Sequence, residues 1–411
     1  MTFGGSVTVR RGLTARTRWL FVDGATDLGG HEVMLLRLLE ELRLHGRVMP
    51  LLLCREGSRL ANQSVTYQVE ESLAAPGRGL LGSGSLARFV GAIRDTWCFA
   101  KVVLRIKPAL CIVAEGCLLA QPVFVVAARL IGRRVVVYVP LVEPSRVLRF
   151  RRARMRDALV RRFYANLPDA WITITRAQAE DFAAWAGVRR PIFHLPNTVA
   201  RRIDEMAQAH VPGDFRGEQG GWRRRRVLVL GRLEAHQKGL DILIDYLATR
   251  ESLSDHLTLT FVGEGPFEFE LRRRIQAVPS MGEWVSVRAW TNTVSVLKRH
   301  DVLLIPSRYE GVPLVMLEAM AMGVPVVASD LAGTRSFLPD SCLFVIGDFE
   351  RAFEIVGTLG DPKISRPVIR RNASTYNVYA SAHAFATSVR ALTEDLRSLT
   401  GLGRKTRESG P

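Results

Sequence analysis

Two cationic side chains, Arg232 and Lys238, lie six residues apart, with Gly231 before the first and Gly239 after the second. The apolar run Val227–Leu230 predicts a strand just before them, and the residues after Gly239 predict a helix. Arginine presents a two-pronged donor and lysine a compact charge, so the pair could straddle a diphosphate at the carboxyl end of a parallel strand. Taken alone, the stretch is also compatible with a solvated basic loop.

A second stretch, Pro306–Ala319, combines two carboxylates with the expected start of a helix. Pro313 suits the first helical position, and the free amides and dipole of that first turn could hold a phosphate. Glu310 precedes the helix and Glu318 lies inside it. Because a carboxylate accepts hydrogen bonds from neighbouring hydroxyls, two of them beside a phosphate suit the two sugars of a nucleotide-sugar. The alternative is a loop charge at Glu310 and an ordinary surface residue at Glu318.

Both stretches need a scaffold of parallel strands. Short apolar runs alternate with helical patterns along the whole chain, which predicts an α/β protein with helices on both faces of its sheets. One amphipathic helix is expected at Glu32–Leu44. Strands are expected at Trp19–Val22, Val48–Leu53, Leu110–Ala114, Val135–Val139, Trp171–Thr175, Pro191–Leu195, Val227–Leu230, Leu257–Val262, Val285–Arg288, Val302–Pro306, Val324–Ala328 and Leu343–Ile346.

The alternation breaks once, over a polar, glycine-containing stretch after Asn197. With 411 residues, the chain also exceeds what one hydrophobic core usually supports. We therefore expect two doubly wound domains that face each other across a cleft. The expected boundaries are 1–199 for an acceptor-binding domain, 200–222 for a linker, 223–375 for a donor-binding domain, 376–400 for a helix that packs back toward the first domain, and 401–411 for a disordered tail.

The charge is strongly positive, with 57 Lys and Arg against 40 Asp and Glu, which predicts attraction to anions. Eight arginines fall within Arg146–Arg162, where Met155, Leu159 and Phe163 recur at helical spacing. This pattern predicts an amphipathic helix that docks on an anionic membrane surface. A merely solvated face is the alternative. Nucleic-acid binding is disfavoured, because no recognised nucleic-acid-binding motif accompanies the arginines.

The remaining composition favours the cytoplasm, with peripheral attachment to the inner face of the cytoplasmic membrane. The five cysteines are scattered without a CxxC pair, which fits a reducing compartment, and residues 1–18 lack a signal-peptide apolar stretch. The apolar segment Ala109–Ile131 is long enough to cross a bilayer. However, Glu115 and Arg129 interrupt it, so a strand, a turn and a buried helix are expected there instead.

Several motifs in the second half resemble the donor-domain signature of the family 4 retaining glycosyltransferases. They are Arg232…Lys238-Gly239, Val262-Gly263-Glu264-Gly265-Pro266, Pro306-Ser307…Glu310-Gly311…Glu318-Ala319 and Gly323-Val324-Pro325-Val326-Val327-Ala328. In the first half, Gly29-Gly30-His31-Glu32 is similar to that family's N-terminal glycine loop, and Pro196-Asn197 to the pair that closes its first domain.

The resemblance implies the GT-B fold and a hexosyltransferase that moves a sugar, with retention, from a nucleotide-diphosphate sugar to a cell-envelope polysaccharide or lipid-linked glycan. Arg232 and Lys238 would bind the diphosphate, and Glu310 the hydroxyls of the donor sugar. The leaving phosphate would help to deprotonate the acceptor on the same face. Substrate contacts are expected from Gly29, Gly30, Gly231, Gly263, Gly311, Val312, Leu314, Val315 and Glu318, the last at the ribose.

The sequence departs from the family's pattern in one place that concerns chemistry. The family often has a histidine after the strand at Val135–Val139, where this chain has Pro140 to Glu143. No DxD pair suited to a metal-bound donor occurs, so we expect metal-independent activity without a cofactor beyond the nucleotide-sugar. Two alternatives stay open: a protein that binds nucleotide-sugar without turnover, and another GT-B enzyme such as a nucleotide-sugar epimerase.

Overall fold

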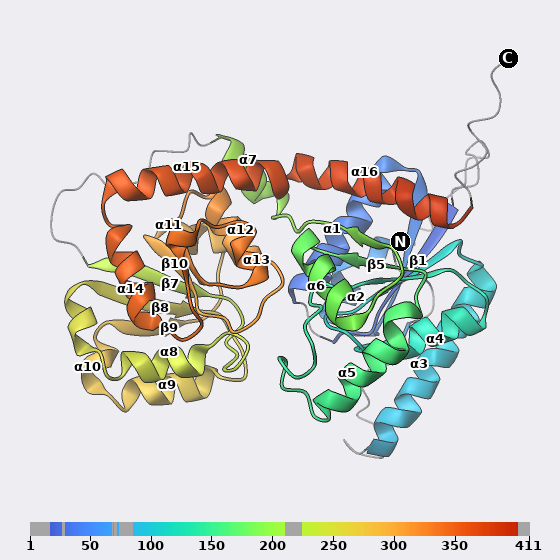
Figure 1. Ribbon diagram of the computed structural model, residues 1–411, viewed down its shortest axis with the longest axis horizontal. Helices are drawn as coiled ribbons and strands as arrows, with labels where there is room; N and C mark the ends of the chain where they lie inside the picture. Colours follow the sequence, from blue (N-terminus) through green and yellow to red (C-terminus); the bar gives the residue numbers. More distant parts are fainter. Residues whose placement is uncertain are drawn as a thin grey trace, which may run out of the picture.

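The computed structural model describes residues 17–26, 29–67, 69, 72–73, 85–209 and 224–401. Residues 210–222 of the expected linker, and all but the first residue of the expected tail 401–411, lie outside these ranges. The described chain forms two α/β domains, each built on a six-stranded sheet (Figure 1).

Both sheets are parallel throughout, with the orders β2-β1-β3-β4-β5-β6 and β12-β11-β10-β7-β8-β9. The first contains β1 Thr17–Asp23, β2 Val48–Cys54, β3 Leu110–Ala114, β4 Val135–Tyr138, β5 Ala170–Thr173 and β6 Ile192–His194. The second contains β7 Arg225–Leu230, β8 Leu257–Val262, β9 Val285–Arg288, β10 Val302–Ile305, β11 Val326–Ser329 and β12 Leu343–Phe344. All twelve predicted strands are confirmed, because fully buried parallel strands are short, continuous apolar runs.

In the first domain, helices cover both faces of the sheet. The predicted amphipathic helix is confirmed as α1, which packs its leucines on one face. Buried side chains of α3, α4, α5 and α6 form a single apolar cluster on the other face. The helices of this domain are α1 Gly30–His45, α2 Arg59–Gln63, α3 Ser85–Ile106, α4 Pro122–Leu130, α5 Ala153–Arg162 and α6 Arg176–Ala186.

The second domain has the same layered arrangement. Helices α8, α9 and α14 pack on one face of its sheet, and α11, α12 and α15 on the other. Its helices are α8 Leu240–Leu247, α9 Glu268–Gln276, α10 Pro279–Gly282, α11 Thr293–Lys298, α12 Leu314–Ala321, α13 Ala332–Arg335 and α14 Phe349–Thr358. Short 3₁₀ turns lie at Val65–Tyr67, Tyr164–Asn166, Glu251–Asp255 and Asp340–Cys342.

Three further helices connect the domains. The expected linker begins with a helix that the sequence did not predict, α7 Arg201–Ala209, which contacts α12. The expected single helix 376–400 overlaps two helices, α15 Pro362–Tyr379 and α16 Ala382–Leu399, which lie end to end along both domains (Figure 1). The second of them packs against α1. The chain therefore crosses from the first domain to the second and returns.

A buried hydrogen-bond network joins these crossings. The Tyr376 hydroxyl donates to Oδ1 of Asp204 at 2.6 Å, and the Ala382 amide donates to the same oxygen at 3.2 Å. The Gln208 side chain donates to Oδ2 at 3.0 Å. Both Tyr376 and Asp204 are buried, so a carboxylate on α7 is held by the end of α15 and the start of α16.

No helix among the described residues has the length and apolarity needed to cross a bilayer. The apolar segment Ala109–Ile131 folds instead as strand β3, a turn and helix α4, which confirms the expectation from its interrupting polar residues.

We predict that Tyr376→Phe lowers the free energy of unfolding by about 1.5–3 kcal/mol, because it removes a buried hydrogen bond to a carboxylate. Urea denaturation measures the change. Tyr379→Phe is the matched control, since Tyr379 lies on the same helix with an exposed side chain. Equal stability of the two variants would show that the Asp204 network does not hold the crossings together.

Candidate functional site

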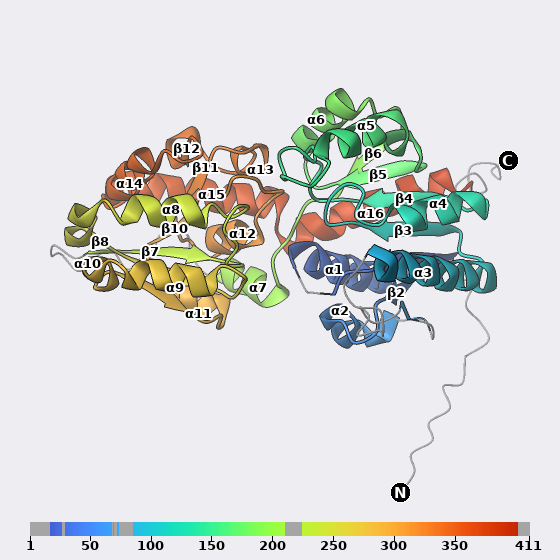
Figure 2. The ribbon, with the colours of Figure 1, turned by 90° about the horizontal axis from the view of Figure 1, so that it is seen from below.

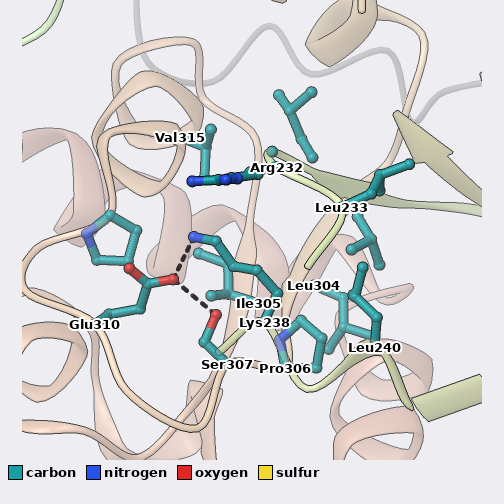
Figure 3. Close-up of a pocket in the computed structure, with 14 residues that line it drawn as sticks. Arg232, Leu233, Lys238, Leu240, Leu304, Ile305, Pro306, Ser307, Glu310 and Val315 are labelled. Carbon is teal, nitrogen blue, oxygen red and sulfur yellow. Dashed lines mark hydrogen bonds and ion pairs between the residues drawn. The ribbon is translucent and has the colours of Figure 1, made fainter. Parts of the chain in front are cut away.

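A pocket opens at the carboxyl ends of β7 and β10 in the second domain (Figure 3). Its lining includes all three residues that the sequence predicted to be catalytic, Arg232, Lys238 and Glu310. The other lining residues are Val229, Leu230, Gly231, Leu233, Leu240, Leu304, Ile305, Pro306, Ser307, Pro313 and Val315. The structure thus brings the two predicted stretches together around one space.

Glycine backbones allow the loop after β7 to lie where it does. Gly231 and Gly263 have φ values of +140° and +153°, and a Cβ atom on Gly263 would overlap the Gly231 carbonyl oxygen. The amide of Gly231 in turn donates to the Val262 carbonyl at 3.0 Å. A side chain at position 263 would displace Gly231 and with it the neighbouring Arg232.

The other end of that loop is fixed against β10. Gly239 precedes α8 with φ of +65°, and a Cβ atom there would overlap the carbonyl oxygen of Pro306. The Arg308 guanidinium forms a two-pronged ion pair with Asp241 at 2.6 and 3.0 Å, and also donates to the His236 carbonyl at 2.8 Å. Sequence reasoning missed Arg308, although it lies within the Pro306–Ala319 stretch.

Glu310 neutralises one of the two cations in the pocket. Its Oε1 accepts from Lys238 Nζ at 2.5 Å and from Ser307 Oγ at 2.8 Å (Figure 3). The Glu310 side chain is 8% exposed and that of Lys238 is 23% exposed, so the pair is shielded from water. Arg232 is exposed, lines the pocket and has no ion-pair partner among the described residues. One cation of the pocket is therefore compensated and the other is open to an anion.

The amino end of α12 completes the pocket wall. The sequence predicted Pro313 to be the first residue of this helix. In the structure it is the residue before the helix, with φ of −61°. The first amides of a helix have no acceptor within it, so those of Leu314 and Val315 are available at this end. The preceding loop is tightly held, because a Cβ atom on Gly333 would overlap the Gly311 carbonyl oxygen.

The first domain approaches the same helix end. Gly29 precedes α1, and a Cβ atom on Gly30 would lie 3.8 Å from Cδ1 of Leu314. The Asn197 side chain donates to the Val312 carbonyl at 2.9 Å. The amino ends of α1 and α12 therefore lie next to each other across the junction, which places Gly30 beside Leu314.

Glu318 does not line the pocket. It lies one turn beyond Leu314 on α12, where the charge of Arg37 on α1 acts on it across the junction. Burial raises the pKa of Glu318 to about 7, and Arg37 opposes that rise. Arg37 itself is held by hydrogen bonds to the Thr198 carbonyl and the Met34 sulfur. Glu318 is thus a junction residue and not an ordinary residue of the outer surface.

His31 is a site residue that sequence reasoning did not single out. Its Nε2 lies 3.3 Å from Asp23 Oδ2 and its Nδ1 lies 3.0 Å from Glu32 Oε2. Burial alone lowers the pKa of His31, but hydrogen bonds and charges from the two carboxylates raise it to about 10. The imidazole is therefore protonated at neutral pH and links the end of β1 to the first turn of α1. The sequence did offer a signal for His31, because this residue lies within the motif Gly29-Gly30-His31-Glu32.

The same three residues have the spacing of a metal site, since their ligand atoms all lie within 4.8 Å of one another. A protonated imidazole has no lone pair for a metal. In addition, Glu32 Oε2 accepts from the Gly29 amide at 2.8 Å, and Asp23 Oδ1 from the Ala25 amide at 2.8 Å. The trio therefore fits an ion-paired cap of α1 better than it fits a metal centre.

The end of β4, where the family's histidine is missing, faces the second domain. A Cβ atom on Gly311 would lie 2.7 Å from the Pro140 carbonyl oxygen and 2.8 Å from Cδ1 of Ile174. Further along, burial and the charge of Asp181 raise the pKa of Glu143. His31 lies instead in the first turn of α1, beside Asp23 at the end of β1.

Comparisons with known proteins agree with this geometry. Residues 224–356 match the model of a family described as "Glycosyl transferases group 1". Among curated proteins, the chain is 25% identical over 178 residues to the UDP-Gal:alpha-D-GlcNAc-diphosphoundecaprenol alpha-1,3-galactosyltransferase of Escherichia coli, covering 41% of this chain and 45% of that protein. It is 32% identical over 149 residues to the phosphatidyl-myo-inositol mannosyltransferase of Mycobacterium leprae, covering 36% and 37%. The matches thus span less than half the length of these relatives.

Solved structures match over almost the whole chain. The Anabaena protein HepE in complex with UDP and glucose superposes with a TM-score of 0.68 at 20% identity, covering 93% of this chain and all of that one. The lipopolysaccharide outer core galactosyltransferase WaaB superposes with a TM-score of 0.64 at 15% identity, covering 92% and 99%. The chain therefore has the GT-B fold of these glycosyltransferases, and its second domain resembles the group 1 glycosyl transferase family.

Proposed function

We propose that this protein is a retaining, hexosyl-transferring glycosyltransferase that uses a nucleotide-diphosphate sugar. One observation carries the proposal: Arg232, Lys238 and the amino end of α12 converge on a single pocket. Two cations and a helix amino end are complementary to a diphosphate. The family match of the second domain supports the same assignment.

The pocket also suits the charge that develops during transfer. The open guanidinium of Arg232 and the ammonium of Lys238 would stabilise the departing diphosphate, so a metal ion is not needed for that role. We propose that the leaving phosphate accepts the acceptor's proton on the same face of the sugar. The protein's part is then to position two substrates and stabilise charge, which its loops, closely packed at glycines, support.

The carboxylates have different proposed partners. Glu310 would exchange its Lys238 and Ser307 contacts for hydroxyls of the donor sugar, and it already lies in the pocket. Glu318 would accept from the ribose hydroxyls at the junction. Contacts of Gly29 and Gly30 with the donor would form through the amino end of α1, which lies beside that of α12.

For the acceptor we propose a lipid-linked glycan or a cell-envelope polysaccharide at the inner face of the cytoplasmic membrane. The Escherichia coli relative is named for a diphosphoundecaprenol-linked sugar, and the Mycobacterium leprae relative for a phosphatidyl-inositol. The arginines of 146–162 would hold the protein near an anionic surface.

The first experiment separates this function from nucleotide-sugar binding without turnover. Purified protein is incubated with a panel of nucleotide-sugars and a membrane extract, and transfer and donor hydrolysis are measured. We expect transfer of label to the lipid fraction. Tight donor binding with neither transfer nor hydrolysis would favour the binding protein, and an altered free sugar nucleotide would favour an epimerase.

We predict that Lys238→Ala weakens donor binding by about tenfold or more, since it removes a cation from the diphosphate and leaves Glu310 uncompensated beside it. Calorimetric titration with the donor measures this affinity. Lys298→Ala, an exposed residue of α11 in the same domain, is the control and should bind as the wild type does. An unchanged affinity in Lys238→Ala would remove this lysine from the phosphate site.

We predict that Glu310→Gln lowers turnover by about a hundredfold while the fold is kept, because the amide preserves shape but cannot balance Lys238 or orient hydroxyls as a carboxylate does. Turnover and melting temperature are measured together. The amide oxygen of the variant can still accept from Ser307, so a large drop in melting temperature is not expected. Wild-type turnover would show that the reacting sugar lies elsewhere.

We predict that donor affinity falls as the pH is lowered from 8 to 6, because Glu318 has a pKa of about 7 and loses its acceptor-only carboxylate form below it. The affinity is measured with a nucleotide-diphosphate sugar, because this ligand has no terminal phosphate that titrates between pH 6 and 8. Glu318→Gln should bind more weakly at pH 8 and show little pH dependence. A variant that keeps the wild-type pH profile would assign the titration to another group.

A further inference from the structure

Helix α3 carries a row of apolar side chains on its outer side. Val90, Ile93, Trp97 and Leu104 recur at helical spacing and are 49%, 55%, 66% and 57% exposed. The opposite side of the helix packs Phe99 and its neighbours into the core. The exposed row is therefore not part of the packing that holds this helix on the sheet, and exposed apolar rows of this kind mark interaction surfaces.

The neighbouring helices continue this surface. Phe124 of α4 and Val160 of α5 belong to the same buried cluster as Phe99 of α3, so the three helices form one layer on one face of the first sheet. They lie along the lower side of the first domain in Figure 1, the side that Figure 2 views. Further exposed apolar side chains on this layer are Val126, Leu130, Met155, Leu159 and Phe163.

The layer is also basic, and its few carboxylates are occupied. Among the side chains that the structure describes, three basic residues lie on α3, one on α4 and four on α5, against a single aspartate on each of α3 and α5. The α4 residue, Arg129, is paired with Asp169 at 2.8 Å. Asp95 is buried and paired with Arg55 at 3.0 Å. Asp157 accepts from the Ser145 amide at 2.6 Å. On the outer side, cations such as Arg94 and Lys101 stand beside the apolar row.

The combination of exposed apolar side chains and cations indicates which kind of partner fits this face. A second copy presenting the same face would bring like charges together, which disfavours self-association. A nucleic acid would use the cations but not Val90, Ile93 and Leu104, the aliphatic side chains of the row. An anionic bilayer uses both, because apolar and aromatic side chains enter the interface while cations meet the headgroups.

We propose that the outer face of α3, α4 and α5 is a bilayer-docking face for anionic lipid, in which Ile93, Trp97 and Leu104 enter the interface. The sequence pointed only to the arginines of 146–162, whereas the structure adds the apolar row of α3. The inference rests on the proposed function, because the purpose of such a face would be to bring the protein to a lipid-linked acceptor.

The docking face is connected to the candidate active site. The segment before α5 contains Arg149, which has φ of +53°. The pKa of His236, in the second domain, is lowered by burial and also by the charge of Arg149. His236 lies on the loop that carries Arg232 and Lys238. A bilayer bound to α3, α4 and α5 would therefore adjoin the segment that leads to the pocket.

The test uses the full chain in sedimentation with vesicles of phosphatidylcholine, with and without about one third phosphatidylglycerol. The variant is Ile93→Ser/Trp97→Ser/Leu104→Ser. The matched control, Phe269→Ser/Val345→Ser, removes apolar side chains that are 80% and 70% exposed on the second domain. We expect the wild type and control to bind anionic vesicles, and the triple variant to bind at least about tenfold more weakly. The charge variant Arg94→Glu/Lys101→Glu should also bind more weakly.

Donor affinity is measured on every variant and separates this proposal from the proposed function. Unchanged donor binding in the triple variant shows that the fold is intact, so its loss of vesicle binding supports the docking face. Absence of donor binding in the wild type would refute the proposed function and leave the vesicle result standing. Equal vesicle binding by triple variant and control would overturn the docking face. The docking face would also be overturned if the wild type did not bind vesicles but self-associated or bound nucleic acid, and if the triple substitution abolished that association.

Discussion

Two cations, Arg232 and Lys238, line one pocket, and the ion pair between Lys238 and Glu310 compensates one of these charges. Glu310 is nearly buried, and both Lys238 and Ser307 donate to its carboxylate. Arg308 is held outside the pocket by Asp241 and supports the loop on which Lys238 lies. Among the residues that the structure describes, the pocket thus carries one uncompensated positive charge and not two.

The second requirement is a fixed relation between the domains, since the candidate substrate contacts come from both. It is met by polar groups buried at the junction and the crossings. Asn197 donates to Val312, the Thr198 hydroxyl donates to the Ala380 carbonyl at 2.7 Å, and Asp204 holds Tyr376. Glu318 opposite Arg37 belongs to the same surface. A change in the angle between the domains would alter the surroundings of each of these groups.

Much of the scaffold follows from local pattern. Most strands are short apolar runs buried between helices, so composition alone marks them, whereas the edge strands β6 and β9 are only partly buried. The same holds for the loops that carry Arg232, Lys238 and Glu310, because a strand followed by glycine and polar residues places side chains at the sheet's edge. The helix α7 was missed because it is short and mostly polar and lies in a stretch that reads as a linker, although its nine residues are amphipathic; its partner Tyr376 is distant in the chain.

The sequence by itself determined two α/β units, the strands that build them and the identity of the pocket's charged groups, because these depend on near-neighbour patterns of burial and on residue type. Tertiary structure alone decided that Glu318 lies opposite Arg37, that His31 is protonated between two carboxylates, and that the apolar row of α3 is exposed beside basic helices. Each of these depends on which elements pack together over long stretches of chain, and charge and exposure follow from that packing.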